Sequence, residues 1–190
     1  MQSSIRILCL GNELLADDAF GAIVAQELKP LLPPSVDVVF SPAMGLALLD
    51  FLQDVQYIFV VDAVQTGTMP PGGLHVCFAT DVMSASGPAQ HYVGLFETLA
   101  LAKELLLPVP EEVVVVMVEV ADCLTVGGPM SREVRTAIPT VVNLISEIIE
   151  QIAQSDLPGG ASPAFLEQVV NAVSSSNFGE GVLIARPATS

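Results

Sequence analysis

Apolar residues along the chain fall in short runs that alternate with amphipathic stretches. Consecutive apolar positions in the runs are typical of strands covered on both faces of a sheet. Amphipathic stretches between them predict helices, so the order favours an α/β fold: three αβα layers, with a mostly parallel twisted sheet of about five strands and helices on both faces. The strands are expected at 5–10, 35–42, 55–64, 74–79 and 111–121, and the helices at 17–32, 45–53, 92–106 and 130–154.

Local signals refine three of these elements. Asp17 is a natural N-cap for the first helix, and Asp18 favours the positive end of its dipole. His75 interrupts the apolar run at 74–79, which indicates an edge strand. Pro139 predicts a kink in the last long helix, or else the junction of two shorter helices.

Composition changes after about residue 155. Residues 1–154 are expected to form one α/β domain, and 155–190 to contain a linker, a short helix near 164–175 and a loose C-terminal tail. No apolar stretch approaches the roughly 18 to 20 residues of a membrane span, and no signal peptide is recognisable at the start. We therefore expect a cytoplasmic protein.

Charge and cysteine content narrow the function classes. A net charge of -15 disfavours nucleic acid as a partner, because phosphate binding needs clustered Lys and Arg. The acidic surface fits a basic protein partner or a cation, and it equally fits simple solubility. Cys9, Cys77 and Cys123 form no CxxC pair, so structural roles are favoured over a disulfide framework.

Candidate chemistry gathers at one edge of the expected sheet. Asp17 and Asp18 follow the first strand, Asp62 closes the strand at 55–64, and His91 precedes the helix at 92–106. Ligands of open α/β sheets bind beyond the carboxyl ends of the strands, and carboxylates with an imidazole suit a divalent transition metal. Each residue also has a purely structural interpretation, as a helix cap, a dipole partner or a turn cap.

The sequence does not support a phosphate-binding loop or a serine nucleophile. The stretch "CLGNELLADDAFG" is not G-x-G-x-x-G, and its carboxylates would repel a pyrophosphate. It also lacks the Lys and Ser/Thr of a P-loop. No G-x-S-x-G nucleophile elbow occurs anywhere in the chain.

Four motifs in order carry a family resemblance: "LGNELLADDAFG", "VVDAV", "AQHYVGLFETLALAKEL" and "VEVADCLTVGGPMSREV". Together they resemble the hydrogenase maturation endopeptidases, which remove the C-terminal extension of the nickel-iron hydrogenase large-subunit precursor. The resemblance implies that Asp18, Asp62 and His91 contact the metal and that Asp17 mainly caps the helix. It also implies that the metal is nickel already seated in the substrate, not retained by the free enzyme. Nickel then serves recognition, polarises the scissile carbonyl or supplies a bound hydroxide.

The chain departs from the family pattern at two places. Ala19 stands where many members have Gly, and Phe40, Ser41 and Pro42 replace an acidic and Gly-rich stretch. Gly45 matches the glycine that ends that stretch, where a positive φ or a close backbone approach is expected. Two alternatives stay open: a non-catalytic binding module for a hydrogenase assembly partner on the same fold, and a small-molecule hydrolase with its own metal.

Overall fold

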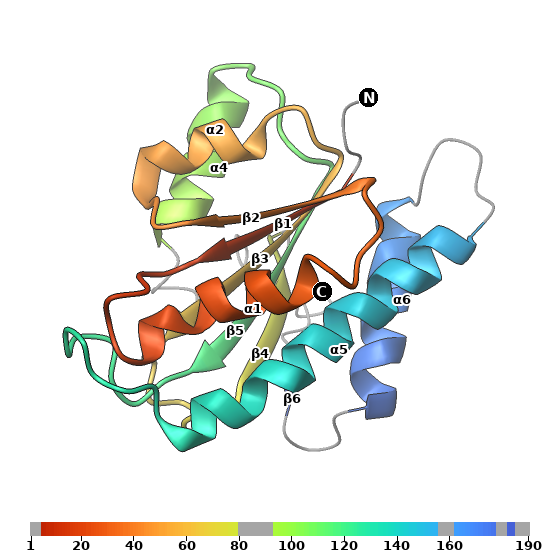
Figure 1. Cartoon of the computed structure of the whole chain (residues 1–190). Coiled ribbons are helices and arrows are strands. Elements are labelled where there is room, and N and C mark those ends of the chain that lie inside the picture. The colour runs from red at the N-terminus through yellow and green to blue at the C-terminus, as the bar shows by residue number, and fades with distance from the viewer. Residues whose placement is uncertain (1–4, 80–92, 156–161, 178–181, 185–190) are drawn as a thin grey trace.

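The structure is a computed structural model that describes residues 5–79, 93–155, 162–177 and 182–184. Its centre is a single sheet with the strand order β2-β1-β3-β5-β4-β6 (Figure 1). The first four strands of that order are mutually parallel, β4 runs antiparallel to β5, and β6 runs parallel to β4. The strands are β1 (Ile5–Leu10), β2 (Val36–Ser41), β3 (Tyr57–Val64), β4 (Leu74–Phe78), β5 (Glu112–Glu119) and β6 (Val182–Ile184). The expected mostly parallel sheet is confirmed, and it carries a sixth short strand.

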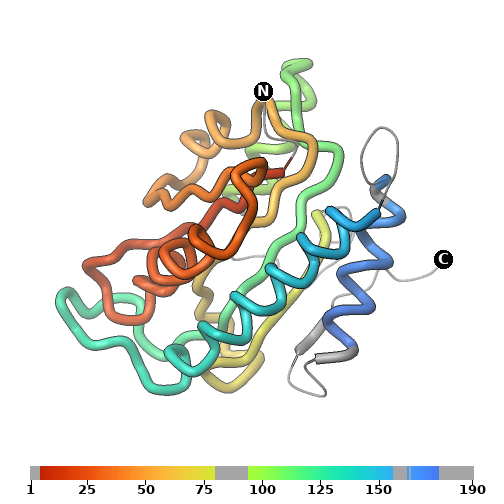
Figure 2. Tube along the Cα trace, turned by 45° about the vertical axis from the view of Figure 1, so that its right-hand side comes forward, coloured from red at the N-terminus to blue at the C-terminus, as the bar shows by residue number. Residues whose placement is uncertain are grey.

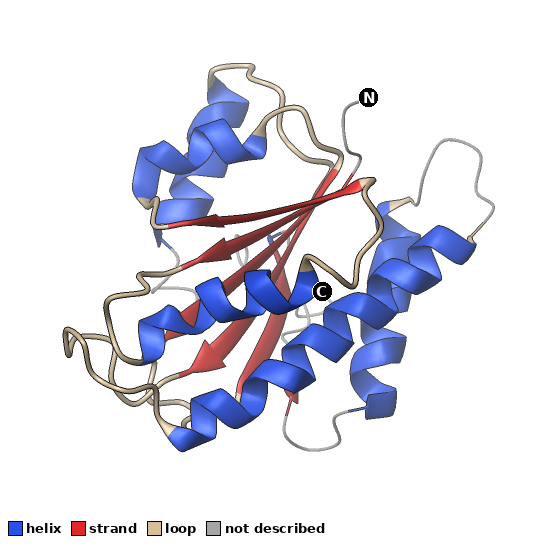
Figure 3. Cartoon of the chain, viewed as in Figure 1, coloured by secondary structure: helices blue, strands red, loops and turns tan. Residues whose placement is uncertain are grey.

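Helices cover both faces of this sheet, which confirms the three-layer arrangement (Figure 3). One face is covered by α1 (Phe20–Leu28), α5 (Arg132–Gln154) and α6 (Pro163–Asn177), and the other by η2 (Gly45–Leu48), α2 (Leu49–Leu52) and α4 (Val93–Glu104). A short 3-10 turn, η1 (Asp17–Ala19), leads into α1.

The consecutive valines of β5 follow from this layering. Successive side chains of a strand point to opposite faces, so a strand between two helix layers needs apolar residues at every position. Val114 and Val116 belong to the core under α1 and α5, whereas Val113 and Val115 belong to the core under α4. The same reason explains the unbroken apolar run of β3.

Pro139 lies inside a single helix, so the junction of two shorter helices is wrong. Proline removes one backbone N–H from the helix, and its ring is tolerated here because Pro139 is exposed. The buried stripe of α5 passes Pro139 on the other side of the helix, through Ala137, Ile138, Val141 and Val142. Packing of that stripe on the sheet holds the helix together across the proline.

Strand β4 does not lie at an edge, because β6 pairs with it on the side away from β5. The polar residue that suggested an edge, His75, is only 3% exposed, and its Nε2 lies 3.4 Å from Oε2 of Glu119. A polar residue in a strand thus marks a buried polar partner as readily as it marks solvent.

The C-terminal segment contributes to the core. The expected short helix is present as α6, and its apolar residues Leu166, Val169, Val170 and Val173 are buried. Figure 2 shows α6 lying beside α5 on the outer side of the molecule. Where a loose tail was expected, Val182–Ile184 form β6. Among the described residues, no helix has the length and apolar character that a bilayer span demands.

The chain order of the strands creates a crevice between β1 and β3. From β1 the chain moves outward to β2 and then returns past β1 to β3. Helix α1 therefore lies on one face and α2 on the other, and the two connections diverge at the carboxyl ends of β1 and β3. Such topological switch points are where open α/β sheets bind ligands.

Candidate functional site

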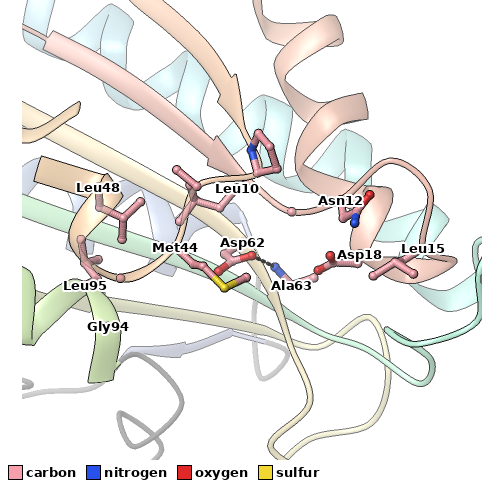
Figure 4. Close-up of a pocket in the computed structure, with 14 residues that line it drawn as sticks. Leu10, Asn12, Leu15, Asp18, Met44, Leu48, Asp62, Ala63, Gly94 and Leu95 are labelled. Atoms are coloured by element: carbon pink, nitrogen blue, oxygen red, sulfur yellow. Dashed lines mark hydrogen bonds between the residues drawn. The ribbon is translucent and has the colours of Figure 1, made fainter. Parts of the chain in front are cut away.

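A pocket of about 290 Å³ opens at this switch point. Its walls come from the β1–α1 loop, the end of β3, the β2–η2 loop and the start of α4. Asp18 and Asp62 both line it, and in Figure 4 the two carboxylates lie between Met44 on one side and Leu15 on the other. The sequence-predicted pair of carboxylates therefore shares one hollow.

Asp62 enters the pocket from within β3, directly after five buried residues. It is half-buried, and its Oδ1 accepts a hydrogen bond from the N–H of Ala63 at 2.8 Å (Figure 4). The strand fixes this carboxylate at the sheet edge, because moving it would require moving the central strand. Behind it, burial and then the charge of Asp62 raise the pKa of the Cys9 thiol to about 12.

Asp18 approaches the same pocket from η1. Burial raises the pKa of the Asp18 carboxyl above its ordinary value, and a hydrogen bond from the backbone of Asn12 opposes part of that rise. The raised pKa means that the ionised form lacks the solvation that water would give it. A cation entering the pocket would restore that stabilisation.

Asp17 does not cap its own helix, which corrects the expectation from the sequence. No side-chain capping bond is present at η1 or α1, and Asp17 is fully buried. Its Oδ2 accepts the N–H groups of Ala121 and Asp122, each at 3.0 Å, and its Oδ1 accepts the N–H of Ser131 at 2.6 Å. Asp17 therefore fastens the β5–α5 loop, including the residue that precedes α5, to the β1–α1 loop.

The two adjacent carboxylates thus have separate tasks. The chain turns Asp17 into the protein and Asp18 toward the pocket. This turn requires a glycine at the end of β1: Gly11 has φ +135°, and a Cβ there would lie 2.2 Å from the carbonyl oxygen of Asp18. The close approach also lets the N–H of Asn12 bond the same carbonyl at 3.2 Å.

The opposite wall of the pocket is apolar. It is formed by the "SPAMG" stretch, in which the N–H of Ala43 bonds Oγ of Ser41 at 3.1 Å, and Pro42 and Met44 line the pocket. Gly45 has φ +57°, which confirms the positive φ expected there. Among the described residues that line the pocket, both carboxylates, Asp18 and Asp62, come from the β1–α1 connection and β3.

His91 lies outside the described residues, so the third residue of the predicted metal set has no structural account here. Within the described ranges, no three His, Cys, Asp or Glu side chains come close enough together to hold a metal ion. The described part of the pocket therefore offers two carboxylates. Carboxylate oxygens can ligate a divalent metal, and two of them leave further coordination positions to be filled by other groups.

Sequence reasoning missed a buried carboxylate that does not line the pocket. Glu119, at the end of β5, is 1% exposed and accepts hydrogen bonds from the N–H groups of Thr66 and Gly67, each at 2.7 Å, and from Oγ1 of Thr66 at 2.5 Å. Burial raises its pKa, but these hydrogen bonds outweigh burial and lower the pKa overall. The available signal was a carboxylate closing an apolar strand, the same signal that identified Asp62.

Comparison with known proteins decides the family. The sequence profile described as hydrogenase maturation protease matches residues 23–148. The chain belongs to this family. It is 27% identical over 152 residues to the hydrogenase expression/formation protein HupD of Bradyrhizobium diazoefficiens, covering 77% of this chain and 78% of that protein. It is 31% identical over 140 residues to HupM of Azotobacter chroococcum, covering 71% and 66%.

Solved structures agree with the fold of this maturation protease. The hydrogenase maturating endopeptidase HybD from E. coli superposes with a TM-score of 0.63 at 20% identity, covering 80% of this chain and 93% of that one. A hydrogenase 2 maturation peptidase from Thaumarchaeota archaeon SCGC_AB-539-E09 gives a TM-score of 0.56 at 26% identity, covering 77% and 97%. The chain is a peptidase of this family.

Proposed function

We propose that this maturation protease removes the C-terminal extension of a nickel-iron hydrogenase large-subunit precursor after nickel has been inserted. The observation that carries the proposal is the placement of Asp18 and Asp62 in one pocket at the switch point of the sheet. They reach the pocket from different segments, a 3-10 turn and a central strand. Family membership supplies the reaction class and the hydrogenase partner.

Nickel is the recognition element on the substrate in this proposal. A nickel ion held by the precursor keeps its own ligands and leaves open positions, which Asp18, Asp62 and His91 would fill with two carboxylates and an imidazole. The raised pKa of Asp18 indicates that burying its charge is unfavourable, and a bound nickel ion would offset that cost. A precursor without nickel would present no cation to two carboxylates and would bind poorly.

Cleavage would then use water and not a protein thiol. The Cys9 thiol, whose pKa the charge of Asp62 affects, is buried and has a pKa of about 12, so almost no thiolate forms at neutral pH. Burial and then the charge of Asp18 also raise the pKa of the Cys123 thiol. An ionised carboxylate has no hydrogen to donate, so Asp18 and Asp62 cannot stabilise a negatively charged oxygen that develops during cleavage. Their role in this proposal is to align the metal-bearing end of the substrate with the pocket.

The test is to incubate the protein with nickel-loaded and nickel-free precursor and to follow the intact mass of the large subunit. We expect loss of the extension from the nickel-loaded form alone. Asp62→Asn and Asp18→Asn should each lower the rate by about 100-fold or more, because each removes a charged ligand. Glu27→Gln, an exposed carboxylate on α1, is the matched control and should match the parent.

Two outcomes would overturn the proposal. Capture of the precursor at full length, without any mass loss, would make the chain a binding module. If the Asp62→Asn variant processed the precursor at the parental rate, Asp62 would have no role in recognising nickel.

A further inference from the structure

Exposed apolar side chains gather around the carboxylate pocket. Eight large apolar residues are well exposed within the described part of the chain, and five of them lie at this end of the sheet. They are on the β1–α1 loop, the β2–η2 loop, η2 and the β5–α5 loop: Leu14, Met44, Leu46, Leu124 and Val126. Single exposed apolar residues are ordinary, but a group of them beside a pocket is characteristic of a binding surface.

Two of these loops are joined to each other beside Asp18. Leu15 and Val126 form an antiparallel bridge, the N–H of Ala16 bonds the carbonyl of Thr125 at 3.1 Å, and the N–H of Gly127 bonds the carbonyl of Leu14 at 2.7 Å. Residues opposite each other in such a bridge place their side chains on the same side. Val126, 76% exposed, therefore extends the pocket wall that Leu15 begins.

We call Leu124 and Val126 the shelf. Their exposed fractions are 79% and 76%. The backbone beneath them is fixed from two sides: Asp17 holds the N–H groups of Ala121 and Asp122, and Oδ1 of Asp122 accepts those of Leu124 and Thr125, each at 3.0 Å. A rigid loop that holds large apolar side chains in water is already organised for binding, so a ligand loses little free energy in ordering it.

Charge restricts what the shelf accepts. Neither loop contains Lys or Arg, since the chain has none from residue 7 to 28 and none from 104 to 131. The charged residues of the two loops are Glu13, Asp17, Asp18 and Asp122, all of them acidic, and of these Asp17 is buried. A ligand that covers the shelf therefore meets apolar surface edged with negative charge, which favours a segment of apolar residues accompanied by Lys or Arg.

We propose that the shelf binds an apolar, basic segment of the substrate protein, next to the site where the pocket receives its metal. The inference rests on the proposed function and identifies that segment with part of the precursor's C-terminal extension. The pocket would select the metal and the shelf would hold the chain beside it. Substrate affinity would then come from two contacts: the metal with the carboxylates of the pocket, and the apolar segment with the shelf.

The experiment compares KM and kcat for nickel-loaded precursor between the parent and the double variant Leu124→Ser with Val126→Ser. The matched control is Leu31→Ser with Leu105→Ser, which replaces side chains 62% and 58% exposed at the helix ends away from the pocket. We expect KM to rise about tenfold in the shelf variant with kcat within about twofold, and no change in the control. Melting temperatures verify that both variants fold.

A second arm tests the basic part of the ligand. Replacing Lys and Arg of the precursor's extension by Gln should raise KM for the parent and weaken its dependence on salt. An unchanged KM in the shelf variant, or a shelf variant that changes only the self-association of the protein, would overturn the inference. If the parent binds precursor without cleaving it, the proposed function fails, and the Kd of the shelf variant for precursor still decides the inference.

Discussion

Oδ1 of Asp17 accepts a hydrogen bond from the backbone N–H of Ser131 at 2.6 Å, across 114 positions of sequence. Ser131 is the residue that precedes α5, and its N–H would otherwise be one of the unpaired donors at a helix start. The carboxylate that precedes Asp18 in the chain therefore binds the start of α5, the longest of the described helices. This hydrogen bond connects the loop that positions Asp18 directly to the start of α5.

Replacing Asp17 should destabilise the whole protein. Asp17→Ala removes a buried carboxylate and leaves three partly buried backbone N–H groups without their acceptor, so we expect a loss of about 2 to 4 kcal/mol in the free energy of unfolding. Asp17→Asn keeps one oxygen acceptor and should lose roughly half as much. Urea unfolding measures both. A loss below about 1 kcal/mol for Asp17→Ala would show that water replaces the carboxylate and that the loops are held by other contacts.

Replacing Asp18 by Asn should make the free protein more stable, in contrast to the replacement of Asp17, while it lowers activity. Its folded-state pKa is raised by burial, so the folded protein holds this proton more tightly than the unfolded chain does. Stability from this group is therefore present below the ordinary pKa and lost as pH rises through the folded pKa. Asp18→Asn removes that loss, and at pH 7 it should stabilise the free protein by about 0.5 kcal/mol, a small value because the group is half-exposed.

The same variant should be nearly inactive, since the neutral amide no longer attracts a cation. In the parent, processing should decline as pH falls toward the raised pKa of Asp18, because protonation removes the charge. A thermal melt and a pH profile of the processing rate measure the two effects. An acid limb that persists unchanged in the residual activity of Asp18→Asn would assign it to another group.

The sheet and its helices are predictable from the sequence because β3 and β5 are apolar at nearly every position, a pattern that only burial on both faces explains. The pocket position follows, because parallel strands bring their carboxyl ends to one edge. Asp62 is recognisable there as a charge directly after an apolar run. These inferences need only local pattern and the rules of strand order.

The roles of Asp17 and His75 could not be predicted in this way, because their partners are distant in sequence. Capping is the commonest role of an Asp at a helix start, but the donors for Asp17 come from the β5–α5 loop. His75 indicated a strand edge, but Glu119 and β6 cover it. Long-range hydrogen bonds leave no periodic signal in the sequence.

Glu119 should contribute to stability in a pH-dependent way. Burial raises its pKa, but hydrogen bonds from Thr66 and Gly67 outweigh burial, so the folded-state pKa lies below the ordinary 4.5. Its contribution is then present above pH 4.5 and is lost as pH falls through the lower folded pKa. We expect Glu119→Gln to cost about 2 kcal/mol at pH 7 and less at about pH 3.5, as measured by urea unfolding.

A double-mutant cycle isolates the main partner of Glu119. Thr66→Val removes the hydroxyl that bonds Oε2 while keeping the shape of the side chain. The costs of Thr66→Val and Glu119→Gln should be non-additive by about 1 kcal/mol, because both remove the same hydrogen bond. Strict additivity would mean that the backbone N–H groups, and not the hydroxyl, hold the carboxylate.

Cys9 should be chemically silent in the native protein. It is fully buried with a pKa of about 12, so a thiol reagent at neutral pH should label it only on unfolding, whereas Cys123, partly exposed, should react slowly in the native state. Cys9→Ala should process precursor within about twofold of the parent and cost about 1 kcal/mol of stability. Loss of processing in a folded Cys9→Ala variant would point to a thiol nucleophile and contradict the use of water.

The C-terminal helix should be an integral part of the domain and not an appendage. Leu166 of α6 is fully buried in the core that α5 and the sheet share, so Leu166→Ala should cost about 2 to 4 kcal/mol by leaving a cavity. Glu167→Ala, at the exposed neighbouring position, is the control and should change stability by less than about 0.5 kcal/mol.

Because α6 lies beside α5 and does not line the pocket, Leu166→Ala should process precursor at the parental rate well below its melting temperature. Equal melting temperatures for the two variants would mean that α6 leaves the core in solution, and the native fold would then be complete at the end of α5.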